Sequence, residues 1–220
     1  MANRPALALI ALFASVVAIT PLAIDMYLPA MPLLSTALHT DAGSVQQSLS
    51  IFLAFYALGM LLFGPLADAI GRRQLALAGL TGFILSSIWP STSTDITSFL
   101  VGRALQAFCG SAATVVVPGL IRQLYQEHTA KGMSYVSMMM IAPLLAPAIG
   151  SVVLVWADWR MIFLVLALYA LLILLLTAKA LPRQSHSHGW QKPQFFSAYK
   201  TVLGQRQAQP MIAASMFASF

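Results

Sequence analysis

Gly64-Pro65-Leu66-Ala67-Asp68-Ala69-Ile70-Gly71-Arg72-Arg73 is a short basic segment with strongly apolar sequence on both sides. Such a segment is typical of a connection between two membrane-spanning helices on the cytoplasmic side of a membrane. We expect Gly64 to end one span and Gly71 to allow a tight reversal into the next. Asp68 can accept hydrogen bonds from Arg72 or from backbone N–H groups that follow it.

The composition indicates a membrane protein. Of the 220 residues, 59% are hydrophobic and 8% are charged, and the mean hydropathy is +0.81. A water-soluble domain needs more charge on its surface, so the bilayer must be the solvent for most side chains. A signal peptide is disfavoured because the first apolar run, 6–23, is too long and lacks a small-residue cleavage site. The single cysteine, Cys109, excludes a disulfide framework.

Apolar stretches of about 20 residues match the hydrocarbon core of a bilayer and predict six spans. We expect them at 6–28, 45–66, 74–91, 96–121, 133–156 and 160–180, so that residues 1–180 form one all-α membrane domain. The polar stretch 181–209 indicates a cytoplasmic linker, and a seventh span is expected from Pro210. The sequence stops at Phe220, partway through that span, and we expect a C-terminal half to be missing from it.

The basic residues predict the orientation of the domain. Ten of the twelve Lys and Arg residues fall on the side of the N-terminus: Arg4, Arg72, Arg73, Arg122, Lys131, Lys179, Arg183, Lys192, Lys200 and Arg206. The opposite side has only Arg160, and Arg103 lies within a span. The positive-inside rule therefore places the N-terminus in the cytoplasm, and the charge of +6 reflects topology rather than nucleic-acid binding.

The linker carries one apolar helical face, from Phe195 to Leu203, flanked by basic residues. This pattern predicts a helix that lies on the inner leaflet or, equally, one that docks against the bundle. His186 and His188 are not expected to bind a metal, because no cysteine or carboxylate is near them.

Two charged residues stand out within the expected spans, where a charge is costly and therefore a candidate for function. Asp25 lies about 27–29 Å from the inner end of the first span, and Arg103 lies roughly 10 Å below the outer surface in the fourth. They can meet if these two spans are neighbours. Burial raises the pKa of a carboxyl group and a nearby guanidinium lowers it, so a carboxylate that changes partners can carry a proton.

Structural roles are the alternative for both residues. In that interpretation Asp25 only caps or kinks the end of its helix together with Pro29, and Arg103 makes only a structural ion pair or a carbonyl contact. Gln106 lies on the same helical face as Arg103 and can extend a polar network. The small residues 110–113 that follow allow another helix to approach closely.

The fifth span contains Pro143 and Pro147, four residues apart, followed by Gly150. Prolines at this spacing remove backbone hydrogen bonds and bend a helix. We expect the bend to shape a cavity or a pivot. The sequence shows no catalytic triad, phosphate-binding loop or metal cluster, which argues against an enzyme and an ATP-driven pump.

Five ordered motifs resemble the Bcr/CflA-type drug:proton antiporters of the major facilitator superfamily. The resemblance rests on residues 25–32, on the 64–73 loop, on Leu100-x-x-Arg103-x-x-Gln106 with Gly110, on residues 142–150, and on Trp159-Arg160-x-Ile162-Phe163. The chain departs from the family pattern at Ala69, where a basic or polar residue is common. It also departs at Gln123, where many relatives carry an aspartate.

The resemblance implies the N-terminal six-helix bundle of a twelve-helix inner-membrane transporter that exchanges protons for drugs such as chloramphenicol or bicyclomycin, with no cofactor besides the proton gradient. Asp25 and Arg103 would couple the proton, and Asp68, Arg72 and Arg73 would gate the inner loop. We expect Tyr27, Phe52, Tyr56 and Gln106 to line the cavity for a small hydrophobic substrate. The alternatives are a nutrient facilitator or symporter of the same fold, an inactive transporter fragment, and a half-transporter that works as a dimer.

Overall fold

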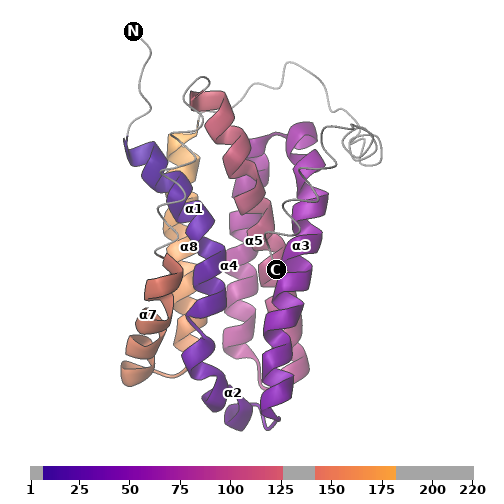
Figure 1. The fold of residues 1–220 in the computed structure, drawn as a ribbon, viewed down its shortest axis with the longest axis vertical. Coiled ribbons are helices and arrows are strands. Elements are labelled where there is room, and N and C mark those ends of the chain that lie inside the picture. Colours follow the sequence, from indigo (N-terminus) through magenta and orange to yellow (C-terminus); the bar gives the residue numbers. More distant parts are fainter. Residues whose placement is uncertain (1–6, 126–141, 182–220) are drawn as a thin grey trace, which may run out of the picture.

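The computed structural model describes residues 7–125 and 142–181, which form helices joined by short turns (Figure 1). In chain order these are α1 (Leu7–Asp25), the 3-10 helix η1 (Leu28–Ala30), α2 (Met31–Ala37), α3 (Ala42–Ile70), α4 (Arg72–Thr92), α5 (Ile96–Tyr125), α7 (Ala142–Trp156) and α8 (Arg160–Ala180). The expected inner-leaflet helix and the expected seventh span lie outside the described residues, as do residues 133–141 of the fifth predicted span.

Five helical segments among the described residues are long and apolar enough to cross a membrane. They are Ala8–Ala37, Ala42–Ile70, Arg72–Thr92, Ile96–Gln123 and Arg160–Ala180. The sixth predicted span coincides with α8, and the third and fourth are confirmed to within a few residues. The described part of α7 is shorter, at 15 residues, because it begins at Ala142.

The prediction that Gly64 ends the second span is wrong. Helix α3 continues through Gly64 and Pro65 to Ile70, and the reversal occurs at Gly71 alone. Gly71 has φ 94°, a conformation that residues with a Cβ rarely adopt, so the helix ends where this glycine stands. Pro65 removes one N–H donor without forcing the backbone out of the helix. Most of the 64–73 segment therefore belongs to the last turns of α3, and Gly71 alone joins α3 to α4.

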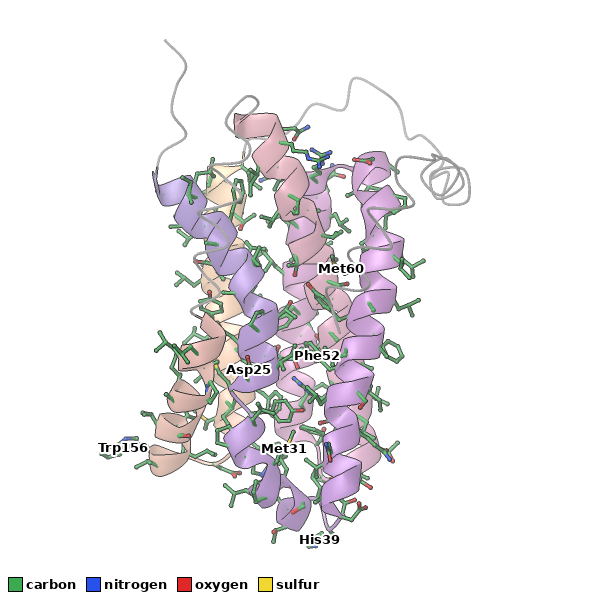
Figure 2. The ribbon with its side chains drawn as sticks, viewed as in Figure 1. Asp25, Met31, His39, Phe52, Met60 and Trp156 are labelled. Carbon is green, nitrogen blue, oxygen red and sulfur yellow. The ribbon has the colours of Figure 1, made fainter. Side chains whose placement is uncertain are left out.

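Helix α5 lies at the centre of the bundle and packs against α1, α3 and α4 (Figure 1). Helix α8 packs against α4 and α1, and α7 packs against α1 and η1. Apolar side chains also point outward from the bundle, as expected where lipid is the solvent. Strongly exposed examples are Leu85, Leu144, Val155, Trp156 and Leu168, and Trp156 projects away from the bundle in Figure 2.

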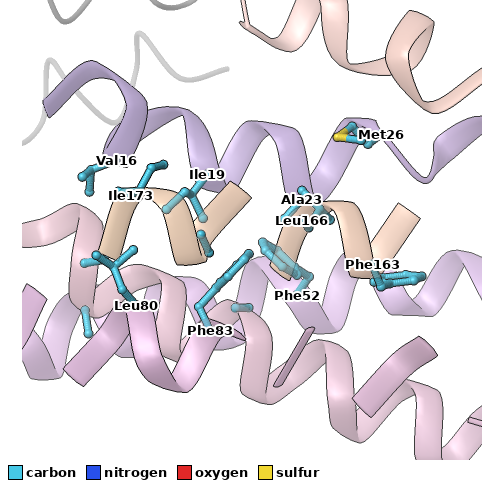
Figure 3. Close-up of a cluster of buried hydrophobic side chains, with 14 of the residues drawn as sticks. Val16, Ile19, Ala23, Met26, Phe52, Leu80, Phe83, Phe163, Leu166 and Ile173 are labelled. Atoms are coloured by element: carbon cyan, nitrogen blue, oxygen red, sulfur yellow. The ribbon is translucent and has the colours of Figure 1, made fainter. Parts of the chain in front are cut away.

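Small residues allow the central helices to approach closely. A Cβ at Gly79 of α4 would lie 2.8 Å from the backbone nitrogen of Ala113 in α5, and a Cβ at Gly59 of α3 would collide with the Ser111 hydroxyl. The predicted role of residues 110–113 as a close-packing surface is therefore confirmed. Figure 3 shows the larger side chains of α1, α4 and α8 filling the interior, with Phe52 of α3 among them.

The helices alternate in direction, so the ends of α3, α5 and α8 lie at the same end of the bundle as the start of α1 (Figure 1). The basic residues of this end in the described chain are Arg72, Arg73, Arg122 and Lys179. Arg160 lies at the opposite end, where α8 begins. Asp41 starts α3 there by accepting a hydrogen bond from the Ser44 backbone N–H, and its hydrogen bonds with Ser44 lower the pKa of Asp41.

Candidate functional site

Arg103 is the centre of the candidate site. Its side chain comes from α5 and is fully buried, with a relative exposure of 0%. Nη1 donates to the Ala23 carbonyl of α1 at 2.9 Å and to Oε1 of Gln106 at 2.7 Å. Nε2 of Gln106 donates in turn to Oγ of Ser87 in α4 at 2.8 Å. Arg103 and Gln106 therefore connect three helices through a single polar network; their spacing predicts the contact between the two residues but not the helices that they join.

Three aromatic rings surround the Arg103 guanidinium. Its central carbon lies 4.2 Å from the ring centroid of Tyr27, 4.3 Å from that of Phe52 and 5.8 Å from that of Phe163. The rings come from the turn after α1, from α3 and from α8. A cation over an aromatic face within about 6 Å is attracted to the ring, and more strongly when water is excluded. We call these three residues the aromatic enclosure.

Two of the three nitrogens of the guanidinium have no hydrogen-bond partner among the described residues. Nε and Nη2 of Arg103 are both buried and unpaired there. A buried donor without an acceptor is costly, and such a donor in a native protein calls for an explanation. The site thus holds a buried cation with free hydrogen-bonding capacity.

Asp25 is the last residue of α1 and is only partly buried. Its carboxylate makes no hydrogen bond or ion pair within 7–125 and 142–181. The first and fourth predicted spans are neighbours, but the predicted contact between Asp25 and Arg103 is not formed in this conformation. Arg103 instead reaches α1 at the carbonyl of Ala23, two residues earlier.

Three of the four residues expected to line a substrate cavity contact Arg103 in this conformation: Tyr27, Phe52 and Gln106. Tyr27, Phe52 and Gln106 are buried, and Tyr56 is partly buried one turn after Phe52. The Tyr27 hydroxyl is 3.0 Å from the Ser48 hydroxyl of α3, which ties the turn after α1 to α3. Figure 2 shows Phe52 at a height along the bundle similar to that of Asp25.

The sequence interpretation gave no role to Phe163, Ser87 or the Ala23 carbonyl. Phe163 belongs to the Trp159–Phe163 motif at the start of α8, and this motif is the only signal that singles it out. Nothing in the sequence marks Ser87 or Ala23. Their roles depend on which helices become neighbours, and a single sequence does not reveal that.

At the other end of the bundle, Arg72 joins α4 to α5. Its Nη1 donates to the Gly119 carbonyl at 2.7 Å, and its Nη2 lies 3.3 Å from the Asp68 carboxylate, as the motif predicts. A Cβ at Gly119 would lie 2.6 Å from Nε of Arg72, so the glycine makes room for the guanidinium. Asp68 is largely exposed, and a pair of this kind contributes little to stability.

Arg73 makes different contacts from its neighbour and caps the C-terminus of α8. Its Nε donates to the Leu181 carbonyl at 2.8 Å, and its Nη2 donates to the Ala178 carbonyl at 3.0 Å. The last carbonyls of a helix lack intrahelical partners, and a cation there also interacts favourably with the helix dipole. The two adjacent arginines therefore hold two different helices.

We expect Arg73→Gln to lower the unfolding free energy of the purified protein by about 1 kcal/mol, because the carbonyls of Ala178 and of Leu181, the residue after α8, lose their charged donor. This change corresponds to a decrease in Tm of roughly 2–4 °C. The control is Arg122→Gln, which removes an exposed arginine at the end of α5 at the same end of the bundle. Equal Tm values for the two variants would contradict the capping role.

The residues expected to bend the fifth span lie in α7. Pro147 is inside the helix, and Pro143 is in the first turn of its described part. Gly150 lies at the crossing of α7 with the turn after α1, where a Cβ would collide with the Met26 carbonyl oxygen. Gly150 therefore allows the backbones of α7 and of the residue after Asp25 to come into contact.

A comparison with family models matches residues 13–220 to the Major Facilitator Superfamily. The chain belongs to this superfamily. Its members are transporters, and the chain is accordingly part of a multi-pass membrane protein. The helical bundle and the five spans described above agree with this assignment.

Named relatives place the chain within the superfamily. It is 36% identical over 150 residues to a chloramphenicol resistance protein of Pseudomonas aeruginosa, covering 67% of this chain and 36% of the relative. It is 32% identical over 154 residues to a bicyclomycin resistance protein homolog of Haemophilus influenzae, covering 69% and 39%. These relatives confirm the resemblance to the Bcr/CflA-type transporters. The matched part spans less than half the length of each relative.

Solved structures share the fold. A peptide transporter, POT, superposes with a TM-score of 0.70 and 15% identity over 96% of this chain and 45% of the other. A D-xylose–proton symporter superposes with a TM-score of 0.65 and 18% identity over 95% of this chain and 53% of the other. At these identities the likeness shows the major facilitator fold alone, and it confirms the predicted six-helix N-terminal bundle.

Proposed function

We propose that the protein exports small hydrophobic drug-like compounds across the inner membrane in exchange for protons. One observation carries this proposal. Among the described residues, a fully buried arginine has two N–H donors without an acceptor, and it is hydrogen-bonded to α1, whose last residue is an aspartate without a partner there. Charged groups within a span are expensive and are retained where they serve transport.

Asp25 is the proton carrier in this proposal, and Arg103 is the group that responds to its charge. When Asp25 is ionised, a rearrangement of the turn after α1 brings its carboxylate toward the free donors of Arg103. When Asp25 is protonated, the attraction is lost, and the Ala23 carbonyl of α1 again accepts the hydrogen bond from Arg103. The two states of the carboxyl group thus favour two arrangements of α1 against α5.

The substrate class is supported by the named relatives, which include a chloramphenicol resistance protein, a bicyclomycin resistance protein homolog and a multidrug resistance protein. Tyr27, Phe52, Tyr56 and Gln106 are the residues proposed to meet the substrate once the bundle opens. They offer aromatic faces and one amide, which suits a mostly apolar molecule with a few polar groups.

The remaining motif residues are proposed to control movement between states. Asp68, Arg72 and Arg73 hold the inner ends of α3, α5 and α8 together and act as the gate of that end. Pro143, Pro147 and Gly150 allow α7 to bend at its crossing with α1. The basic residues at this end favour an orientation in which it faces the cytoplasm, together with the N-terminus.

The test uses everted inner-membrane vesicles containing the protein made from its own gene. We expect radiolabelled chloramphenicol to accumulate inside the vesicles when respiration acidifies the lumen, and to leak out when a protonophore collapses the gradient. The control is vesicles without the protein. Accumulation that ignores the protonophore and follows the gradient of a nutrient would instead identify a facilitator and contradict the proposal.

A further inference from the structure

The environment of Arg103 lacks a charged partner among the described residues, and proton exchange alone does not explain how the buried cation is stabilised. A guanidinium that is fully buried is normally paired with a carboxylate, because an isolated buried charge is expensive. No acidic group lies within ion-pair distance of Arg103 among the described residues. Its neighbours there are two hydrogen-bond acceptors, the Ala23 carbonyl and the Gln106 amide, together with the Tyr27 hydroxyl and three aromatic rings.

The three rings come from separate parts of the fold and approach the same carbon. Tyr27 and Phe52 lie within 4.3 Å of it, and Phe163 adds a third ring at 5.8 Å. Both of the nearer rings are buried, with exposures of 0% and 1%, so they shield the cation from bulk solvent. The face of an aromatic ring carries negative electrostatic potential, and it can therefore offset part of the charge without accepting a hydrogen bond.

This kind of stabilisation has a consequence for the donors. A carboxylate partner would occupy Nε and Nη2 of Arg103, whereas ring faces leave both nitrogens unpaired. The enclosure thus keeps the guanidinium charged and in place while its hydrogen-bonding edge stays available. A group that must exchange partners during a transport cycle needs this combination.

We propose that Tyr27, Phe52 and Phe163 are positioning residues for proton coupling, which hold Arg103 as a cation in place of a counter-ion and leave its Nε and Nη2 free for the Asp25 carboxylate. This inference rests on the proposed function. It gives the three aromatic residues the role of stabilising Arg103 in the conformation described here, in which Asp25 does not contact it. Phe52 is the cleanest position for a test, because its side chain has no polar group and contacts the guanidinium from α3.

The experiment replaces Phe52 with phenylalanine carrying one, two or three fluorine atoms, incorporated at that codon in the protein made from its own gene. Fluorination weakens the negative potential of the ring face in steps and changes the ring volume little, so the variants are expected to fold. We expect Tm to fall stepwise with fluorine number and chloramphenicol export to fall in parallel, by about tenfold at three fluorines.

Two controls test whether the effect of fluorination depends on the Arg103 cation. The same series at Phe83, a buried phenylalanine of α4 with no ring or cation contact among the described residues, should leave Tm and export nearly unchanged. The series at Phe52 in an Arg103→Met background should leave Tm unchanged, because the cation is absent there.

The possible failures are distinguishable. A flat Tm series at Phe52, or equal slopes at Phe52 and Phe83, would overturn the aromatic cation site. A sloping Tm series with constant export would overturn its positioning role in coupling. The proposed function itself is judged separately by the Asp25→Asn variant and the protonophore, neither of which alters the rings.

Discussion

Asp25→Asn is expected to abolish proton-driven export, reducing accumulation in everted vesicles by roughly 100-fold or more. The amide has nearly the same size as the carboxyl group but cannot bind and release a proton in this pH range. It also cannot attract the free donors of Arg103 as an ion does. The measurement is chloramphenicol accumulation at matched protein abundance, with the abundance determined by immunoblot of the same membranes.

Asp41→Asn is the matched control for that experiment. Asp41 is the exposed acidic residue that starts α3, and an asparagine side chain can replace it as the helix cap. Export should be unchanged in this variant. If Asp25→Asn exports chloramphenicol at the unmodified rate and still depends on the proton gradient, the assignment of Asp25 is wrong.

Gly150→Ala is expected to destabilise the bundle strongly, although it adds only one methyl group. The added Cβ would collide with the Met26 carbonyl oxygen and would lie 2.9 Å from the carbonyl carbon of the same residue. These atoms belong to the backbone, which cannot rotate aside as a side chain can. Forcing α7 away from the turn after Asp25 should cost about 3 kcal/mol, which lowers Tm by roughly 6–12 °C.

The control for this prediction is Gly64→Ala. Gly64 lies inside α3, and a Cβ there meets no atom within 4 Å. Alanine is the better helix former, so Tm should stay the same or rise slightly. If the two alanine variants unfold at the same temperature, the close approach of α7 to the Met26 backbone does not exist in the protein.

The helices could be predicted because each span is a long apolar run with polar ends. This is why the prediction for 160–180 coincides with α8, and why the basic residues fall at one end of the bundle. The end of α3 was harder to predict, because Gly64-Pro65 is a common signal for the end of a helix and yet lies inside α3. The signal that decides is the positive φ of Gly71, seven residues later, and a backbone angle is visible only in the structure.

The candidate site could be predicted only in part. Arg103 and Gln106 stand out because polar residues are rare in spans, and their spacing of three residues places them on one face. The partners of Arg103 on other helices could not be predicted in the same way. Phe52 and Phe163 resemble ordinary core residues, and the Ala23 carbonyl is a backbone atom that any residue would supply.

Proton release from the purified protein when substrate binds shows directly whether Asp25 carries the exchanged proton. Chloramphenicol is added to the protein in weakly buffered detergent solution, and the change in pH is recorded with a pH-sensitive dye. We predict that the unmodified protein and Asp41→Asn release protons and that Asp25→Asn releases none. Undiminished proton release from Asp25→Asn would show that another group carries the proton and that the role proposed for Asp25 is wrong.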